Sequence, residues 1–422
     1  MIKPESSSRS PFPAGPRRTY PHVIVIGAGL GGLCLAQGLR RAGIGVAVYE
    51  RDVSATARGQ GHRLHIDARG RRALAEVLPP HLFSLIEAIA GRPAPRVNGF
   101  DHQLRPTGVF PLDDPTPDRP AHDDAMPAHT VLDRQVLRRI LLTGLDEIVH
   151  FGRSFVGYDE DGDVVTARFA DGSTTQGSVL VAADGVGSVV RAQRLPNARV
   201  ADSRTRLIYG RVPLTAELRR TLPPTMFTVF NSVAGPDHRF VGIAPVEHRE
   251  RPGAAAARLA PEVAFGPAPD TLAVMFGRRI ERLGRTDAEL SAASGADLRA
   301  LVLEQLAGWH PLLTGIVESW TPSSVYAIRV RSSVPLPPWP ASNVTLLGDA
   351  IHAMSPAAGA GANIALRDGA ALAAALAEVG AGRSVPAAIQ DYEQVMSRAG
   401  FRMVRLSAAN GTRMLGADPL PC

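Results

Sequence analysis

A strand, a glycine-rich turn and a helix follow one another within residues 22–50, near the start of the chain. The β-branched run 23–26 predicts a buried strand. A G-x-G-x-x-G motif begins where this run stops, and its glycines are Gly27, Gly29 and Gly32. A helical pattern over 30–42 then leads to a second apolar run, 46–49, which is followed by Glu50. This order predicts a βαβ unit with an acidic residue at its end, an arrangement typical of dinucleotide binding.

Each part of this unit has a physical role in binding a dinucleotide. Gly27 permits a sharp turn, Gly29 lets the backbone approach a pyrophosphate, and Gly32 allows the helix to pack closely on the strand. The free N–H groups and the dipole at the helix start favour phosphate. The Glu50 carboxylate would accept hydrogen bonds from an adenosine ribose and repel a 2′-phosphate, which favours FAD or NAD over NADP. A glycine-rich turn without a ligand is the alternative interpretation.

Composition excludes several classes of function. Lys3 is the only lysine, so arginine supplies nearly all of the positive charge behind the net charge of +6. The chain has no block of clustered basic residues, so its sequence does not indicate nucleic-acid binding. Schiff-base and P-loop chemistry need a lysine in the site, and the only lysine lies in the N-terminal tail. The only cysteines, Cys34 and Cys422, cannot form a thiolate zinc cluster, and we expect no metal site. Their scarcity fits a reducing, cytoplasmic compartment, and no apolar run reaches the ~18 residues that a membrane span needs.

Changes of pattern along the chain predict its organisation. Residues 1–20 are rich in Pro and Ser without an apolar signal core, so we expect a disordered lead and not a targeting peptide. The proline-rich stretch 91–129 and the short alternating strands of 204–339 predict a substrate domain, with an Ala- and Pro-rich linker at 253–269. Residues 386–422 contain a C-terminal helix. The remaining segments form a discontinuous cofactor-binding domain, namely 21–90, 130–203 and 340–385.

Two further motifs follow apolar runs later in the chain. The run 179–183 is closed by Asp184 and Gly185, and the run from residue 343 is closed by Gly348 and Asp349. Each run predicts a buried parallel strand, so each motif is expected at a strand end. The Asp349 carboxylate would accept hydrogen bonds from hydroxyl groups of a ligand.

Two further predicted helices start at residues that could contact a ligand. A loop leads from the Gly348-Asp349 motif into a long helix that starts at Asn363. The loop residues that we expect to contact a ligand are Pro356, Gly359 and Gly361. The N–H groups of that helix start would meet partial negative charge. The pattern over 131–142 predicts a second helix, with Asp133 as its N-terminal cap and Arg134 in its first turn.

The chain resembles the single-component, FAD-dependent aromatic hydroxylases of the para-hydroxybenzoate hydroxylase type over about residues 22–410. The resemblance depends on Arg134, on the 356–363 loop and on three motifs in order: GAGLGG at 27–32, ADG at 183–185 and GDA at 348–350. It implies an α/β fold in which a Rossmann-like FAD-binding domain carries a mixed-sheet substrate domain. An NAD dehydrogenase fits poorly, because its dinucleotide fold has no use for a Gly-Asp motif so far downstream.

The resemblance also implies the cofactor contacts. The glycine motif would face the FAD pyrophosphate, Glu50 the adenosine ribose, and Asp349 a hydroxyl of the ribityl chain. The helix start at Gly361, Ala362 and Asn363 would face the flavin pyrimidine edge. The Asp-Gly motif is linked with both FAD and NAD(P)H. The complete set of expected cofactor contacts is Gly27, Gly29, Gly32, Glu50, Arg51, Gly61, Arg134, Asp184, Gly185, Gly348, Asp349, Pro356, Gly359, Gly361, Ala362 and Asn363.

The implied reaction inserts one oxygen atom from O₂ into an aromatic or polyketide-like small molecule. NADH or NADPH would reduce the flavin, and a flavin C4a-hydroperoxide would transfer the oxygen. Arg191 and Tyr209 are the candidate catalytic residues. Arg191 fits the basic residue that follows the Asp-Gly motif, with a structural ion pair as its alternative, and Tyr209 is the preferred residue for substrate contact. Further candidates for substrate contact are His65, Arg211 and His238, for which ordinary packing or surface placement is the alternative.

Two other classes of function stay open on the sequence. The same frame serves epoxidases, antibiotic-inactivating oxygenases and a few flavin reductases, so a flavin dehydrogenase or reductase without oxygen insertion is one alternative. A non-catalytic protein that sequesters a ligand or flavin is the other. Labelled oxygen in the product would distinguish the monooxygenase from the first alternative, and any turnover would exclude the second.

Overall fold

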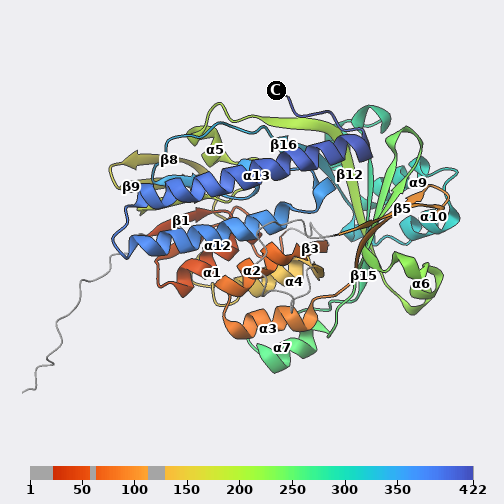
Figure 1. Cartoon of the computed structure of the whole chain (residues 1–422), viewed down its shortest axis with the longest axis horizontal. Helices are drawn as coiled ribbons and strands as arrows, with labels where there is room; N and C mark the ends of the chain where they lie inside the picture. Colours follow the sequence, from red (N-terminus) through yellow and green to blue (C-terminus); the bar gives the residue numbers. More distant parts are fainter. Residues whose placement is uncertain (1–21, 58–62, 113–128, 422) are drawn as a thin grey trace, which may run out of the picture.

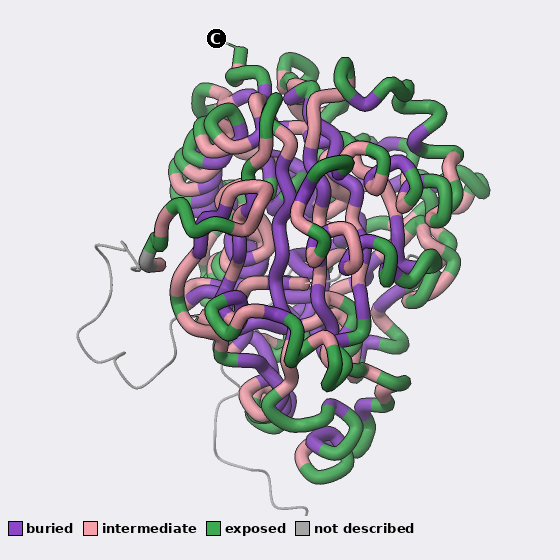
Figure 2. Tube along the Cα trace, turned by 90° about the vertical axis from the view of Figure 1, so that its right-hand side faces the viewer, coloured by how far each residue is buried: buried purple, intermediate pink, exposed green. Residues whose placement is uncertain are grey.

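The computed structural model of the chain describes residues 22–57, 63–112 and 129–421. The predicted lead 1–20 and the expected cofactor contact Gly61 lie outside the described residues. Figure 1 shows a helix-covered parallel sheet in one half of the molecule and a large twisted sheet in the other. Buried residues run along the strands at the centre, and exposed residues lie mainly in turns and on outer helix faces (Figure 2). No described helix combines the length and apolar character needed to cross a membrane.

The first half is organised around five parallel strands in the order β17-β11-β1-β2-β7. The predicted βαβ unit is present, because β1 pairs with β2 and α1 connects them. β1 and β11 are buried along their whole length, as expected for β-branched runs covered on both faces. The strands are β1 (Val23–Ile26), β2 (Val46–Tyr49), β7 (Val149–His150), β11 (Val179–Ala182) and β17 (Val344–Leu346).

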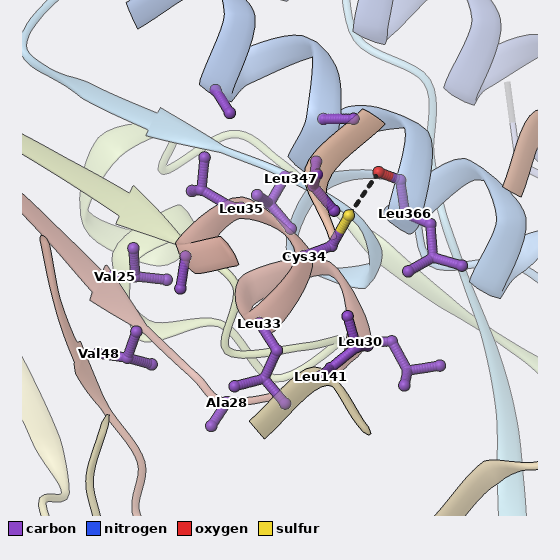
Figure 3. Packing of buried hydrophobic residues seen from close by; sticks show 14 of the residues in the cluster. Val25, Ala28, Leu30, Leu33, Cys34, Leu35, Val48, Leu141, Leu347 and Leu366 are labelled. Carbon is purple, nitrogen blue, oxygen red and sulfur yellow. Dashed lines mark hydrogen bonds between the residues drawn. The ribbon is translucent and has the colours of Figure 1, made fainter. Parts of the chain in front are cut away.

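Close packing of α1 (Leu30–Arg41) on α12 (Gly361–Val379) holds this half together. A Cβ atom on Gly369 would lie 2.7 Å from the Gly31 carbonyl oxygen, so the two helices approach through glycine. Cys34 is fully buried at this contact and its Sγ donates to the Leu366 carbonyl oxygen at 3.3 Å (Figure 3). Burial raises the pKa of the Cys34 thiol, which makes it an inert packing group as expected.

The second half is a seven-stranded mixed sheet in the order β16-β12-β15-β14-β13-β4-β5. One face is covered by α8 (Asp287–Ala292), α9 (Gly295–Gln305) and α10 (Pro311–Glu318), whose leucines complete a second apolar core. The strands are β4 (Ala94–Asp101), β5 (Pro106–Pro111), β12 (Val200–Pro213), β13 (Thr228–Ala234), β14 (Phe240–Val246), β15 (Thr271–Arg279) and β16 (Tyr326–Ser333). The two halves match the predicted α/β architecture with a mixed-sheet second domain.

A two-stranded ribbon of β3 (Arg63–Asp67) and β6 (His129–Asp133) lies between the halves, and α13 (Val385–Leu415) runs across both (Figure 1). The predicted linker at 253–269 is wrong in part, because Pro252–Leu259 forms α7 and packs on α3. The other elements are α2 (Ala68–Val77), α3 (Pro80–Ile89), α4 (Arg134–Leu142), β8 (Phe155–Asp161), β9 (Val164–Phe169), β10 (Thr174–Gly177), α5 (Val189–Arg194), α6 (Ala216–Thr221) and α11 (Asp349–His352).

Candidate cofactor and substrate site

The structure brings the three motifs together at the carboxyl ends of three neighbouring strands of the parallel sheet. β1, β11 and β17 are neighbours, with Ile26 opposite Ala182 and Ala182 opposite Leu346, so the motifs that follow them begin side by side. Gly27 has a φ of +108°, and a Cβ atom there would lie 2.4 Å from the Ala183 carbonyl oxygen. A Cβ atom on Gly31 would lie 2.7 Å from Leu347 Cδ1. The glycine motif therefore lies against the second motif and against the residue that precedes the third.

Glu50 ties the glycine turn to the end of β2. Its Oε2 atom accepts a hydrogen bond from the Ala28 N–H at 2.8 Å, and its Oε1 atom accepts one from the Asp52 N–H at 3.0 Å. A carboxylate oxygen accepts more than one hydrogen bond, so both oxygens keep acceptor capacity for ribose hydroxyls. Arg51 follows and is exposed beside this corner.

Asp349 and Arg134 lie close enough for their charges to interact, but they form no ion pair. Asp349 is exposed, yet neighbouring protein removes enough water for desolvation to raise the pKa of its carboxyl. The charges of His352 and Arg134 oppose that rise in pKa. Among the described residues, neither Asp349 nor Arg134 has a side-chain hydrogen-bond partner or an ion pair within 4.0 Å. An accessible but desolvated acid with a separated cation is the arrangement expected around a polar ligand.

Two helix starts at this site lack a side-chain cap. α1 begins after Gly29 and α12 after Ala360, and neither has a capping hydrogen bond from a side chain. The neighbouring α2 and α4 are capped by Asp67 and Asp133, which confirms the predicted Asp133 cap. Uncapped N–H groups at the two ends of one site fit a ligand with a pyrophosphate at one end and a polarisable carbonyl at the other.

The α12 start is fixed to β3 by the Asn363 side chain. Its Oδ1 atom accepts from the Asp67 N–H at 3.0 Å, and its Nδ2 atom donates to the His65 carbonyl oxygen at 2.9 Å. Gly70 has no room for a side chain, because a Cβ atom there would lie 2.2 Å from the Asn363 Oδ1 atom. A Cβ atom on Gly361 would lie 4.0 Å from Asp349 Oδ1, so this helix start borders the acid. Because the Asn363 side chain is occupied, a cofactor contact by this residue would have to come from its backbone, and that contact stays a prediction.

The loop before α12 and the other motif glycines have local roles. Pro356 begins a short 3₁₀ turn that ends at Gly359, which has a φ of +60°. Gly348 also has a positive φ, as does Gly185, so both strand ends turn through backbone that favours glycine. Ala362 lies in the first turn of α12. The assignment of these residues to cofactor contact stays a prediction.

Arg191 links the second and third motifs. Its Nη1 atom donates to the Ala350 carbonyl oxygen at 2.7 Å, and its Nη2 atom donates to the Val186 carbonyl oxygen at 2.8 Å. Asp184 accepts from the Val189 N–H at 2.9 Å, while its buried Oδ1 atom has no partner. Burial raises the pKa of Asp184 and lowers that of Arg191. The observed contacts of Arg191 are with backbone, and its catalytic role stays a prediction.

Two supporting residues of the site were missed from the sequence. Arg138 donates from Nε to the Ala28 carbonyl oxygen at 3.2 Å and also bonds the Ala55 carbonyl, which holds the glycine turn from α4. Arg138 is four residues after Arg134 on α4, so the two side chains lie on the same helix face, and this spacing could have indicated Arg138 as a second site residue. Asp368 on α12 is fully buried, bonds His352 Nε2 at 2.5 Å and accepts from the Gly348 N–H at 3.3 Å.

The large sheet presents a half-buried aromatic face. Tyr209 stacks on Tyr326 with ring centroids 5.5 Å apart, and burial raises the pKa of the Tyr209 hydroxyl. Phe230 and Met275 pack on the same face, beside the end of α13. The alternation along β12 places Arg211 on this face as well, and its Nη1 atom lies 3.6 Å from Asp133 of the ribbon. The aromatic face is therefore turned toward the half with the three motifs.

His238 lies elsewhere, in the exposed turn between β13 and β14. It has a φ of +54°, and a Cβ atom on Gly416 would lie 3.0 Å from its ring. Its observed contact is therefore with the chain beyond α13, and a substrate contact by His238 stays a prediction.

His65 is held in one tautomer by His129. His129 Nε2 lies 3.0 Å from the Leu112 carbonyl oxygen and so carries a proton, which leaves His129 Nδ1 to accept from His65 Nε2 at 2.8 Å. His65 Nδ1 then has no proton, and it lies 3.9 Å from the Cβ position of Gly359. Burial, with the charges of Arg63 and His129, lowers the pKa of His65 to about 3. His65 is therefore a neutral acceptor beside the α12 loop.

The depressed pKa of His65 predicts acid-sensitive folding. Because the unfolded state takes up the proton near pH 6.5 and the folded state does not, the stabilising contribution is complete above that pH and falls as the pH drops toward 3. Between pH 7.5 and 5 the wild type should lose about 2 kcal/mol more unfolding free energy than His65→Gln. Urea titrations at the two pH values measure this difference, and equal losses in both proteins would contradict the assignment.

Comparison with known proteins agrees with this geometry. A family model described as "FAD binding domain" matches residues 20–70 and 319–407, which contain the first and third motifs. A solved structure from Photorhabdus luminescens subsp. laumondii, described as an FAD containing monooxygenase, is 31% identical with a TM-score of 0.77. The match covers 93% of this chain and 98% of that one. The chain belongs to the FAD-dependent monooxygenase family.

Two curated relatives in this family are longer proteins. A dual O-methyltransferase/FAD-dependent monooxygenase of Phaeosphaeria nodorum is 35% identical over 85% of this chain and 40% of its own length. Another, from Cercospora beticola, is 33% identical over 94% of this chain and 47% of its own length. The chain thus spans less than half the length of these relatives. The family assignment confirms the predicted resemblance and fold class, and FAD is the cofactor that the site residues fit.

Proposed function

We propose that this protein uses NADH or NADPH and O₂ to insert one oxygen atom into an aromatic or polyketide-like small molecule, through a flavin C4a-hydroperoxide. The observation that carries the proposal is the meeting of three motifs at the ends of neighbouring strands, beside two uncapped helix starts and the interacting charges of Asp349 and Arg134. FAD, when bound there, supplies the redox and oxygen-activating chemistry. The relatives that are named monooxygenases support the same reaction class.

The chain's own residues would position and stabilise the reactants. The N–H groups at the α12 start, residues 361–363, would stabilise negative charge on the pyrimidine edge of a reduced flavin. The Arg211–Asp133 contact joins the large sheet to the ribbon, which brings the aromatic face toward the cofactor half. Burial beneath that face would exclude water from the reacting atoms.

The aromatic face supports a flat, apolar substrate. Tyr209, Tyr326 and Phe230 are partly buried and present ring surfaces, which favour stacking and offset contacts with another ring system. The raised pKa of Tyr209 keeps its hydroxyl protonated at neutral pH, so it would act as a hydrogen-bond donor to a substrate oxygen.

The experiment that tests the function uses ¹⁸O₂ with the FAD-loaded protein, NADH or NADPH, and a panel of hydroxylated naphthalenes and anthraquinones. We expect at least one compound to stimulate nicotinamide oxidation and to yield a product that carries one ¹⁸O atom. Stimulated oxidation with unlabelled product would instead establish a dehydrogenase or reductase. FAD binding without any turnover across the panel would favour a ligand-sequestering protein.

A further inference from the structure

Arg63 crosses from the ribbon to the large sheet. It is the first residue of β3, and its Nη2 atom donates to the Val229 carbonyl oxygen on β13. The pairing of β13 with β4 shifts register between Thr228 and Phe230, so Val229 lies at an irregular point of the ladder. The Arg63 guanidinium is therefore held at the junction of the two halves by a single neutral acceptor.

The charge of Arg63 has no counter-charge in the described chain. Its Nε atom is buried without a hydrogen-bond partner, and no acid of the described residues forms an ion pair with it. Asp133 lies opposite Arg63 in the ribbon, but its carboxylate caps the start of α4 and faces Arg211. Desolvation alone lowers the pKa of Arg63 to about 10. Because Arg63 is half-buried and buried charges in proteins are normally paired, its charge calls for an anion that the described residues do not supply.

The place of Arg63 shows where that anion would come from. Arg63 and His65 lie on the same face of β3, while Leu64 and Ile66 enter the apolar core. His65 faces the Gly359 loop, which is the expected flavin side. On the other side, the Arg63 contact at Val229 immediately precedes Phe230 of the aromatic face. Arg63 therefore lies between the flavin loop and the face expected to hold the substrate ring.

We propose that Arg63 binds an anionic oxygen, a carboxylate or a phenolate, of an aromatic substrate. The inference rests on the proposed function and narrows its substrate class from aromatic molecules to aromatic anions. A guanidinium suits this task because its planar set of N–H donors matches the two oxygens of a carboxylate. Since Nη2 donates to Val229, the remaining guanidinium N–H groups, which have no acceptor among the described residues, are the donors available to the ligand.

The test compares three aromatic carboxylates with their neutral amides by isothermal titration calorimetry of the FAD-loaded protein. The probes are benzoate, 1-naphthoate and anthracene-9-carboxylate. We expect at least one carboxylate to bind wild type about 10-fold or more tightly than its amide. Arg63→Met should reduce that preference to within about twofold, and Arg63→Lys should retain only part of it. Arg220→Met is the matched control, because this substitution removes the same charge from an exposed position on α6.

Three outcomes of the carboxylate titrations would overturn the inference. In the first, no carboxylate binds wild type more tightly than its amide. In the second, the preference for the carboxylate is unchanged in the Arg63 variants. In the third, Arg220→Met loses that preference as much as Arg63→Met does. A loss of FAD affinity in Arg63→Met with carboxylate preference intact would also overturn it, by assigning the anion to the cofactor. If Arg63→Met does not fold, Arg63→Lys decides, with a loss of about threefold or more in preference expected. Calorimetry requires no turnover, so a failure of oxygen insertion stays distinguishable from a failure of anion binding.

Discussion

Gly29→Ala is expected to leave the protein folded and to weaken FAD binding by about 100-fold or more. Gly29 has a φ of −77°, which alanine adopts without strain, and a Cβ atom there meets no atom of the described residues within 4 Å. Nothing in the part of the chain that the structure describes therefore requires glycine at this position. Glycine is required only if a ligand approaches the backbone closely, which is the role of the second motif glycine toward a pyrophosphate. A 100-fold change corresponds to about 2.8 kcal/mol of binding free energy.

The matched control is Gly27→Ala, two residues earlier in the same turn. Here a Cβ atom would lie 2.4 Å from the Ala183 carbonyl oxygen, and φ is +108°, so the variant should lose thermal stability or fail to fold. Differential scanning fluorimetry measures folding of both variants, and fluorescence quenching of FAD measures binding. Wild-type FAD affinity in folded Gly29→Ala would contradict the placement of the pyrophosphate.

Asp349→Asn is expected to weaken FAD binding by about 10- to 100-fold while raising the stability of the flavin-free protein. Removing a hydrogen bond from a charged acceptor costs about 1.5–3 kcal/mol, which gives this range of affinity. The opposite effect on folding follows from the raised pKa of Asp349. The folded state disfavours the ionised form relative to the unfolded state, so at neutral pH the ionised carboxyl destabilises the flavin-free fold.

The two effects of Asp349→Asn are measured separately. Calorimetric titration with FAD gives the affinity, and thermal unfolding of the flavin-free protein gives the stability. The expected rise in stability should disappear as the pH falls below the raised pKa of Asp349, because the wild-type carboxyl is then neutral as well. A variant that is less stable without FAD, with unchanged FAD affinity, would show that Asp349 has a structural role only.

Local patterns predicted the cofactor half well. The βαβ unit, the strand before each motif and the Asp133 cap all depend on neighbours within a few residues, which the sequence displays directly. The helix α7 was misread as a linker because its alanines resemble flexible composition, although Pro252 at its first turn is a helix-start signal. Apolar packing of α7 against α3 decides its structure, and that contact is remote in sequence.

Long-range contacts set the limit of prediction at the site. The sequence marked Asn363 and His65 separately, but not the hydrogen bond that joins them across almost 300 residues of chain. It could not show that Arg211 faces Asp133, or that Arg63 lacks a counter-charge among the residues that the structure describes. These facts depend on how the ribbon docks on the large sheet, which no local pattern encodes.

Titration of the flavin-free protein with FAD and with FMN tests the central claim, that three distant motifs form one dinucleotide site. The account predicts one FAD per chain, with FMN bound at least about 100-fold more weakly because it lacks the adenosine and second phosphate that Glu50 and the Gly29 turn would hold. Failure to bind FAD, or equal affinity for FAD and FMN, would contradict it.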